Sequence, residues 1–366
     1  MNDESIRPYG LFTTIVLTTI GVGAFSYPRY VCEVAGRDGW ISALVAGVLA
    51  LIMVSLIYYV QKLNNFDSYV EIIFNSFGKF FGYINLFLFM IYVVVTLSVD
   101  MRRFAEVLKI YLLQNTPIEF LVLTILALGI YVVGFGVGDL MKFNEVVFFI
   151  VFIPMILGFI FLINSVDFTN IMPIGKSGIY ETYVSGVYRG FLAFGGYEIL
   201  FLTAPFIKDR KKIKKITLWS IIFIAVFYSF LTIYCISIFE VEETKSLLWP
   251  AITMIASIDI PGNFVERWEG IVMILWILFY FTTFIALLYF ACYTMRYGFK
   301  IRKARIGAII LIPIIYFITM YADNIIHLDY LCKKLLIPLE FINIVIVPIL
   351  LFIINVIKKE RRRGVR

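Results

Sequence analysis

The stretch that decides the fold is Thr18-Thr-Ile-Gly-Val-Gly-Ala-Phe-Ser-Tyr-Pro28, an apolar segment of helix length that two glycines interrupt near its middle. A second segment, Phe191-Leu-Ala-Phe-Gly-Gly-Tyr-Glu-Ile-Leu-Phe201, is interrupted in the same way. Irregular backbone inside a bilayer is tolerated only where it lines a cavity or a site, because unpaired amides and carbonyls are costly in lipid. Two such breaks at matching points of two halves are typical of the central binding site of a transporter.

The composition places most of the chain in a membrane. Of its 366 residues, 61% are hydrophobic and 16% are charged, and the mean hydropathy is +0.94. A soluble domain of this size does not carry so much apolar surface. The net charge of +7 lies in short Lys and Arg runs between apolar segments, which is typical of cytoplasmic loops and argues against a nucleic-acid surface.

Ten segments satisfy the length and apolarity that a helix needs to cross a bilayer. They are Tyr9–Val31, Trp40–Gln61, Phe80–Leu113, Phe120–Gly136, Asn144–Ile163, Tyr183–Ile207, Ile213–Phe239, Glu269–Tyr297, Ile306–Tyr321 and Leu335–Ile357. We therefore predict an all-α integral membrane protein with a single transmembrane domain over residues 1–366 and a basic tail at 358–366. The connection from Glu240 to Trp268 predicts a short helix at Ile252–Ile258, which covers the extracellular mouth as a lid.

The distribution of Lys and Arg predicts the orientation. With a cytoplasmic N-terminus, the inner side carries Lys208–Lys215, the cluster from Arg296 to Arg305 and the tail. The positive-inside rule then puts both termini in the cytoplasm.

The two breaks predict an internal repeat. Gly21 lies about 18 Å along a helix that enters from the cytoplasm at Tyr9, and Gly195 lies about as far along one that enters from outside near Tyr183. Equal depth and opposite direction indicate a 5+5 inverted repeat, over about 9–163 and 183–357, with discontinuous helices 1 and 6. The alternative is that these glycines only serve close helix packing.

The helix ends at a break offer a site for a small charged molecule. Free N–H groups of the half-helix that begins at Ala24 favour an anion, and free carbonyls near Ile20 and Phe194 favour a cation. A zwitterionic amino acid matches both. Glu198 adds a carboxylate at this depth, which pairs with a substrate ammonium, binds a proton, or caps its own half-helix.

Spans three and eight supply further polar groups. Thr96 and Tyr92 are expected to line the pocket, and Thr282 and Thr283 either coordinate a ligand or bond back to their own helix. The candidate ligand-binding residues are Thr19, Gly21, Val22, Gly23, Ala24, Thr96, Phe194, Gly195, Gly196, Tyr197, Glu198, Ile199, Thr282 and Thr283. Glu340 and Asn343 in span ten are weaker candidates.

The charges at the end of span three allow two interpretations. Asp100 with Arg103, and Arg102 with Glu106, have the i,i+3 and i,i+4 spacing of intrahelical ion pairs. They either belong to the site or mark where the helix emerges into water.

The residue inventory argues against catalysis and against a metal or other cofactor. His327 is the only histidine and is expected in an external loop, so neither a His pair nor a His-assisted nucleophile can form. The four cysteines lack C-x-x-C spacing and are interpreted as core residues, with a Cys32–Cys332 disulfide left open.

Several motifs resemble those of one family. Ile20-Gly-Val-Gly-Ala-Phe-Ser-Tyr-Pro28, followed by Ala35-Gly-Arg-Asp-Gly-Trp-Ile-Ser42, resembles the start of the B subunits of bacterial spore germinant receptors. Phe194–Phe201, Trp249-Pro250 and Glu266-Arg-Trp-Glu269 also fit. These subunits are similar to amino acid/polyamine/organocation permeases and share their LeuT/APC-like fold.

The resemblance implies a nutrient sensor in the spore inner membrane, with termini on the core side. It would act with a larger A subunit and a lipoprotein C subunit, and amino acid binding would trigger germination. A proton- or cation-coupled amino acid permease is the alternative, and a membrane scaffold with a vestigial pocket is a third.

Overall fold

The structure, a computed structural model, describes residues 6–258 and 268–364, and helices joined by short connections make up most of these residues. The α-helices are α1 Pro8–Ile20, α2 Tyr27–Ala35, α3 Gly39–Leu63, α4 Tyr69–Tyr111, α5 Ile118–Val132, α6 Val137–Phe161, α7 Gly186–Leu192, α8 Leu200–Thr203, α9 Arg210–Ser246, α10 Pro250–Ala256, α11 Trp268–Gly298, α12 Ala304–Tyr321, α13 Ile325–Leu331, α14 Ile337–Phe341 and α15 Val347–Gly364. Helices satisfy their backbone hydrogen bonds internally, which is what a lipid environment requires.

The all-α membrane fold is confirmed. Seven helical segments of the described residues are long and apolar enough to cross a bilayer: Tyr27–Leu63, Tyr69–Tyr111, Val137–Ser165, Arg210–Ser246, Met273–Gly298, Ala304–Tyr321 and Ile325–Arg361. Three shorter apolar helices are Pro8–Ile20, Ile118–Val132 and Tyr197–Phe206. The first and third of these belong to the two interrupted helices, and the count of ten spans stays a prediction.

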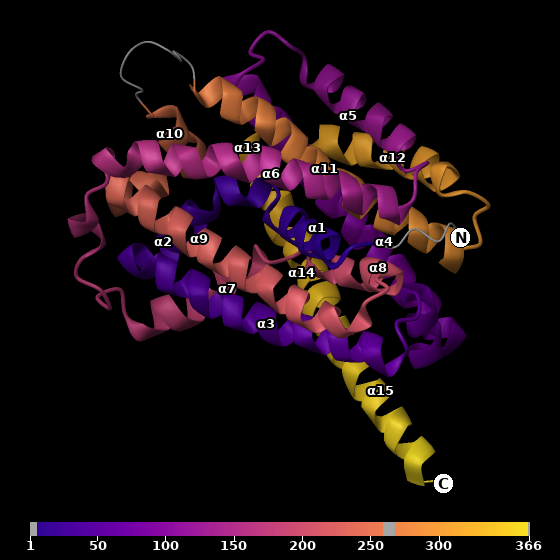
Figure 1. Ribbon diagram of the computed structural model, residues 1–366. Helices are drawn as coiled ribbons and strands as arrows, with labels where there is room; N and C mark the ends of the chain where they lie inside the picture. Colours follow the sequence, from indigo (N-terminus) through magenta and orange to yellow (C-terminus); the bar gives the residue numbers. More distant parts are fainter. Residues whose placement is uncertain (1–5, 259–267, 365–366) are drawn as a thin grey trace.

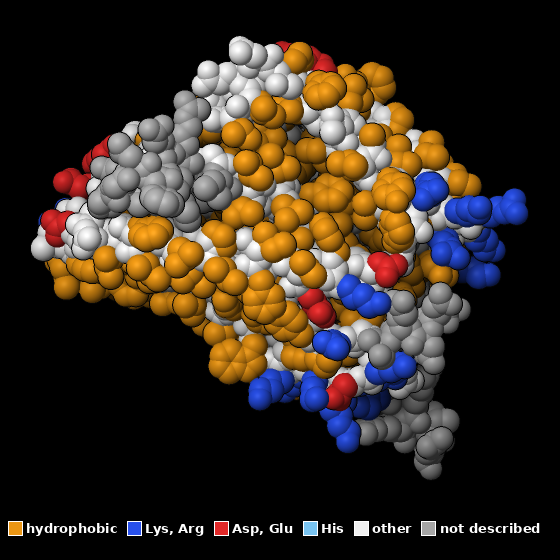
Figure 2. Space-filling view, turned by 45° about the horizontal axis from the view of Figure 1, so that its top comes forward, with side chains coloured by type: hydrophobic (Ala, Val, Ile, Leu, Met, Phe, Trp, Pro, Cys, Tyr) orange, Lys and Arg blue, Asp and Glu red, His pale blue; other side chains and the backbone are white. Residues whose placement is uncertain are grey.

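Helix α1 lies at the centre of the bundle. It packs against α6, α9 and α11, and α3 runs along α9 (Figure 1). The outer face is apolar, and α6 alone exposes Val146, Phe149, Ile153, Ile156 and Ile160. Figure 2 shows this apolar surface with Lys and Arg side chains gathered along its lower and right edges. A lipid-facing band bordered by charge is what a membrane protein presents.

Two helices begin earlier than the hydropathy pattern predicts. Helix α4 begins at Tyr69, not Phe80, because Ser68 and Glu71 form a capping box, and the helix kinks at Gly78. The last span begins at Ile325, not Leu335, because the Asn324 side chain accepts a hydrogen bond from the His327 N–H. His327 therefore lies in the first turn of a helix and not in a loop.

The predicted short helix in the external connection is present as α10, two residues earlier than expected. Trp249, just before it, is buried with its ring edge-on to Tyr111 at 6.1 Å. Glu266 and Arg267 of the motif named above lie outside the described residues. All four cysteines are free, so no Cys32–Cys332 disulfide forms.

Candidate functional site

The first break separates α1 from α2. Helix α1 ends at Ile20, Gly21 adopts φ 44° and ψ −152°, and a 3₁₀ turn occupies Val22–Phe25 before α2 begins at Tyr27. The second half-helix therefore begins at Tyr27 and not at Ala24. Pro28 accounts for the position, because proline lacks an N–H and is favoured in the first helical turn.

The second break separates α7 from α8, and it contacts the first. Helix α7 ends at Leu192, and Gly196 has φ 114° ahead of a 3₁₀ turn at Tyr197–Ile199. A Cβ on Gly196 would lie 2.8 Å from the carbonyl oxygen of Thr18 and 2.8 Å from the Cα of Thr19. The two interrupted helices thus meet at their breaks, as the glycine pairs predicted.

The Tyr228 hydroxyl lies between the two breaks. It is 3.4 Å from the Thr19 carbonyl, 3.3 Å from that of Ile20 and 3.1 Å from that of Ala193. The expectation that the carbonyls near Ile20 are free needs correction, since this hydroxyl donates towards them. Each carbonyl has two lone pairs, so acceptor capacity remains at both helix ends.

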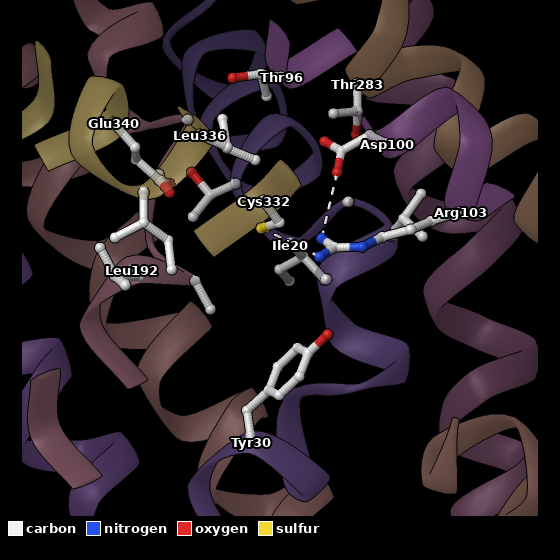
Figure 3. A pocket seen from close by; sticks show the side chains of 18 of the residues that line it. Ile20, Tyr30, Thr96, Asp100, Arg103, Leu192, Thr283, Cys332, Leu336 and Glu340 are labelled. Atoms are coloured by element: carbon white, nitrogen blue, oxygen red, sulfur yellow. Dashed lines mark hydrogen bonds and ion pairs between the residues drawn. The ribbon is translucent and has the colours of Figure 1, made fainter. Parts of the chain in front are cut away.

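A cavity of about 210 Å³ opens beside the breaks (Figure 3). This volume is below the roughly 300–1,000 Å³ of pockets for drug-sized ligands. The cavity leads from Gly21 and Gly196 to the exposed side chains of Glu33 and Lys333. Its size suits a small solute that enters from this end.

Eight of the fourteen candidate residues line the cavity: Thr19, Gly21, Val22, Gly23, Thr96, Gly195, Gly196 and Thr283. The other six are buried outside its lining: Ala24, Phe194, Tyr197, Glu198, Ile199 and Thr282. Phe194 and Tyr197 have a structural role. Phe194 packs edge-on to Tyr228 at 5.5 Å, and the Tyr197 hydroxyl donates to the Ile344 carbonyl at 2.7 Å.

Glu198 has the geometry of a helix cap. One carboxylate oxygen accepts from the Gly196 N–H at 2.7 Å, and the other accepts from the Tyr92 hydroxyl at 2.8 Å. The residue is 2% exposed. Of the three interpretations of this carboxylate, the cap is the one whose contacts are present, and a direct ligand contact stays a prediction.

The threonines differ in their use. Thr96 donates to the Tyr92 carbonyl at 2.9 Å and Thr282 to the Phe279 carbonyl at 2.6 Å, so both bond back to their own helix. Thr283 instead donates to the Leu17 carbonyl at 2.8 Å, which ties α11 to the last turn of α1 at the cavity wall.

The span-three charges divide between the site and the core. The Arg102–Glu106 pair forms at 2.8 Å with both side chains largely buried, and the Asp100–Arg103 pair forms at 3.9 Å on the cavity wall. Both predicted ion pairs are confirmed. The guanidinium of Arg103 also lies 3.7 Å from Asp329 and 3.3 Å from the Cys332 sulfur.

The charged residues at the exposed end of the cavity, which include Arg29, Glu33 and Arg189, were not among the candidates. Glu33 lies 3.0 Å from Arg29 and 3.7 Å from Arg189, and thereby joins α2 to α7. Neither Arg189 nor Asp329 carries a local sequence signal, because their partners are distant in the chain. Asp100 and Arg103 did carry a local sequence signal, which is their i,i+3 spacing. No group of three potential metal ligands occurs among the described residues.

The sequence matches the family described as "Spore germination protein" over residues 5–327. Spore germination protein B2 of Bacillus subtilis (strain 168) is 28% identical over 351 residues, which cover 95% of this chain and 94% of the relative. Spore germination protein A2 of the same organism is 26% identical over 358 residues, with coverage of 94% and 93%.

A solved structure with a similar fold is the substrate-bound, outward-open state of a Na⁺-coupled sialic acid symporter. The TM-score is 0.65 over 93% of this chain and 79% of the symporter chain, at 12% identity, so the likeness concerns the fold. It confirms a LeuT-like membrane fold. The match to a family of spore germination proteins fits the expectation that the chain is not an enzyme. The chain therefore belongs to the spore germination protein family, and the resemblance to germinant receptor B subunits drawn from its first helix break is confirmed.

Proposed function

We propose that this chain is the subunit of a nutrient germinant receptor that binds a small nutrient, an amino acid, in the central cavity and thereby triggers germination. One observation carries the proposal: two interrupted helices meet beside a cavity of about 210 Å³ in a chain of the spore germination family. Ligand acts by binding one arrangement of the bundle better than another.

The proposal includes a setting. The chain lies in the spore inner membrane with both termini on the core side, and A-type and C-type (lipoprotein) subunits read its change of state. Residues 9–163 and 183–357 act as the two inverted repeats of one domain, and 358–366 is a cytoplasmic tail. The basic edges of the molecule support this orientation (Figure 2).

The test is ligand-dependent thermal stabilisation of the purified protein in detergent, with the common amino acids and nucleosides as probes. A ligand that binds only the folded state stabilises it by RT ln(1 + [L]/Kd), so the melting temperature rises with ligand concentration. We expect at least one amino acid to do so, and a lack of response to every probe contradicts the proposal.

A cavity-filling variant links that response to the site. A Cβ on Gly23 would meet no atom within 4 Å, so Gly23→Leu should extend into the cavity and abolish stabilisation. Gly136→Leu is the matched control, because Gly136 is exposed and the nearest atom to its Cβ lies at 3.9 Å. An unchanged response in Gly23→Leu places the ligand elsewhere.

A working amino acid permease is the second candidate, and the symporter-like fold favours it. Counterflow of labelled amino acid in proteoliposomes separates the two. Uptake by the isolated chain supports the permease, whereas binding without uptake supports the receptor subunit.

A further inference from the structure

Glu340 is the acidic residue of the cavity wall that has no ion pair or hydrogen bond among the described residues. The other acidic wall residues are each paired with an arginine. Glu33 lies near Arg29 and Arg189, and Asp100 and Asp329 flank Arg103. Figure 3 shows Glu340 across the cavity from Arg103, whose guanidinium is turned towards Asp100 and Cys332. Arg103 is thus paired with other groups and forms no ion pair with Glu340.

The helix around Glu340 is built irregularly. Glu340 lies in the short α14, between π-helical segments at Cys332–Leu336 and Ile342–Ile346, and Pro338 precedes it by two residues. Single-turn π segments inside α-helices often occur at functional sites. Here they flank the turn that carries the carboxylate.

Glu340 also comes into contact with the second helix break. A Cβ on Gly195 would clash with the Glu340 carboxylate. The carboxylate can therefore lie against the second helix break only because residue 195 has no side chain. Both residues line the cavity. The carboxylate thus faces the same space as the helix ends.

Unused acceptors lie in the same wall. Thr18 and Thr19 both line the cavity, are 3% and 5% exposed, and have hydroxyls without a hydrogen-bond partner among the described residues. Buried polar groups are normally hydrogen-bonded, so an unpaired hydroxyl beside a cavity points to a missing partner. The lining residues thus include a carboxylate, two threonines whose hydroxyls are buried and unpaired, and the helix-end carbonyls, all of which are hydrogen-bond acceptors.

We propose that Glu340, with Thr18 and Thr19, forms a cation subsite that binds the ammonium group of the ligand. An ionisable group in a membrane-spanning segment is expensive unless it is paired, and an ammonium group supplies both a charge and three donors. This inference rests on the proposed function and names the chemistry of its ligand: a molecule with a free amino group. Glu198, whose oxygens accept from Tyr92 and Gly196, is a cap and not this subsite.

The test compares matched probes on the full-length protein. The common amino acids, their N-acetyl derivatives and simple alkylammonium ions are assayed by thermal shift and equilibrium binding with wild type, Glu340→Gln, Glu340→Asp and Glu119→Gln. N-acetylation removes the positive charge and keeps the carboxylate and side chain. Glu119 is exposed on α5, away from the cavity lining, so its variant controls for the substitution itself.

We expect amino acids to bind and their N-acetyl derivatives to fail. Glu340→Gln should weaken amino acid binding by about thirtyfold or more, the range for truncation of a buried charge pair. Glu340→Asp should retain part of the affinity, and Glu119→Gln should match wild type. If Glu340→Gln does not fold, the Glu340→Asp affinity and the N-acetyl comparison decide.

Two results overturn the subsite in different ways. Equal amino acid binding by wild type and Glu340→Gln, or equal binding of N-acetyl derivatives, removes the subsite and leaves the proposed function intact. A wild-type protein that responds to no amino acid or alkylammonium ion removes both.

Discussion

Asp38 shows what a single residue of a family motif does. Its side chain is fully buried, and its two oxygens accept from the Gly175 N–H at 2.8 Å and the Ser177 N–H at 3.0 Å. Two residues of the same motif hold the same connection. Arg37 donates to the Met172 carbonyl, and Ser42 donates to the Thr182 carbonyl at 2.7 Å, in the helical turn before α7. The motif is thus a clamp on the connection between α6 and α7.

Asp38→Ala should destabilise the protein without touching the cavity. The substitution removes two hydrogen bonds from Gly175, which is exposed, and Ser177, which is half-buried. Water can replace the carboxylate at both N–H groups, so the expected loss is about 1 kcal/mol for each bond. Thermal unfolding in detergent should show a lower melting temperature, and limited proteolysis should show faster cleavage between residues 164 and 182. Asp167→Ala is the control, because Asp167 is exposed and only holds Thr169. Equal melting of Asp38→Ala and wild type would contradict the clamp.

Glu198, buried outside the cavity lining, and Glu340, which lines the cavity, show how far the role of a single residue can be predicted. The sequence places Glu198 at a helix break, so its depth and its capping role are both predictable. The position of Glu340 against Gly195 depends on how the last span packs across the bundle, which no local pattern encodes. Glu340 was accordingly a weaker candidate.

At the scale of the helical elements, the breaks require glycine at one position and tolerate a side chain at another. Gly196 has φ 114°, and a Cβ there would lie 2.8 Å from the α1 backbone, whereas a Cβ on Gly23 would meet open space. Gly196→Ala should therefore lower the melting temperature and abolish ligand stabilisation, because the added methyl group forces the backbones of the two breaks apart. Gly23→Ala, a methyl in free space, should melt like wild type. Equal melting of the two variants would contradict the close approach.

Tyr228 in α9 and Tyr27 in α2 offer a second pair of matched substitutions. Their rings stack at 4.1 Å, but only the Tyr228 hydroxyl has partners, the carbonyls of both broken helices, while the buried Tyr27 hydroxyl has none among the described residues. Tyr228→Phe should lower the free energy of unfolding by about 1 kcal/mol and increase amide exchange at the breaks. Tyr27→Phe should do neither. Similar exchange in both variants would show that ring packing alone joins the breaks.

The element boundaries were predictable where hydropathy ends and unpredictable where capping extends a helix. The predicted span Ile306–Tyr321 lies within α12, Ala304–Tyr321. Helix α4 runs eleven residues further towards the N-terminus because Ser68 and Glu71 cap a polar turn that a search for apolar segments does not include. The capping-box spacing was present in the sequence and is the signal that finds it.

At the scale of the whole molecule, the cavity is closed at the helix breaks and open at its other end. The Tyr92–Glu198 and Tyr197–Ile344 hydrogen bonds are buried beside the breaks, and the cavity reaches exposed Glu33 and Lys333 at the other end. The meeting of the two helix breaks could be predicted from the glycine pairs, and the 5+5 inverted repeat stays a prediction. The open end could not be predicted, because it depends on ion pairs between distant helices such as Arg103–Asp329 and Arg189–Glu33.

Thiol labelling tests the open end and the orientation together. Cys332 lines the cavity and is partly accessible, whereas Cys32, Cys235 and Cys292 are fully buried. A membrane-impermeant methanethiosulfonate should therefore label the protein once, from the side opposite the termini, and Cys332→Ser should abolish labelling while Cys292→Ser leaves it unchanged. An amino acid that stabilises the protein should slow the reaction by occupying the cavity. Labelling only from the side of the termini would show that the cavity opens towards the cytoplasm, and labelling that survives Cys332→Ser would show that the helices around the buried cysteines open as well.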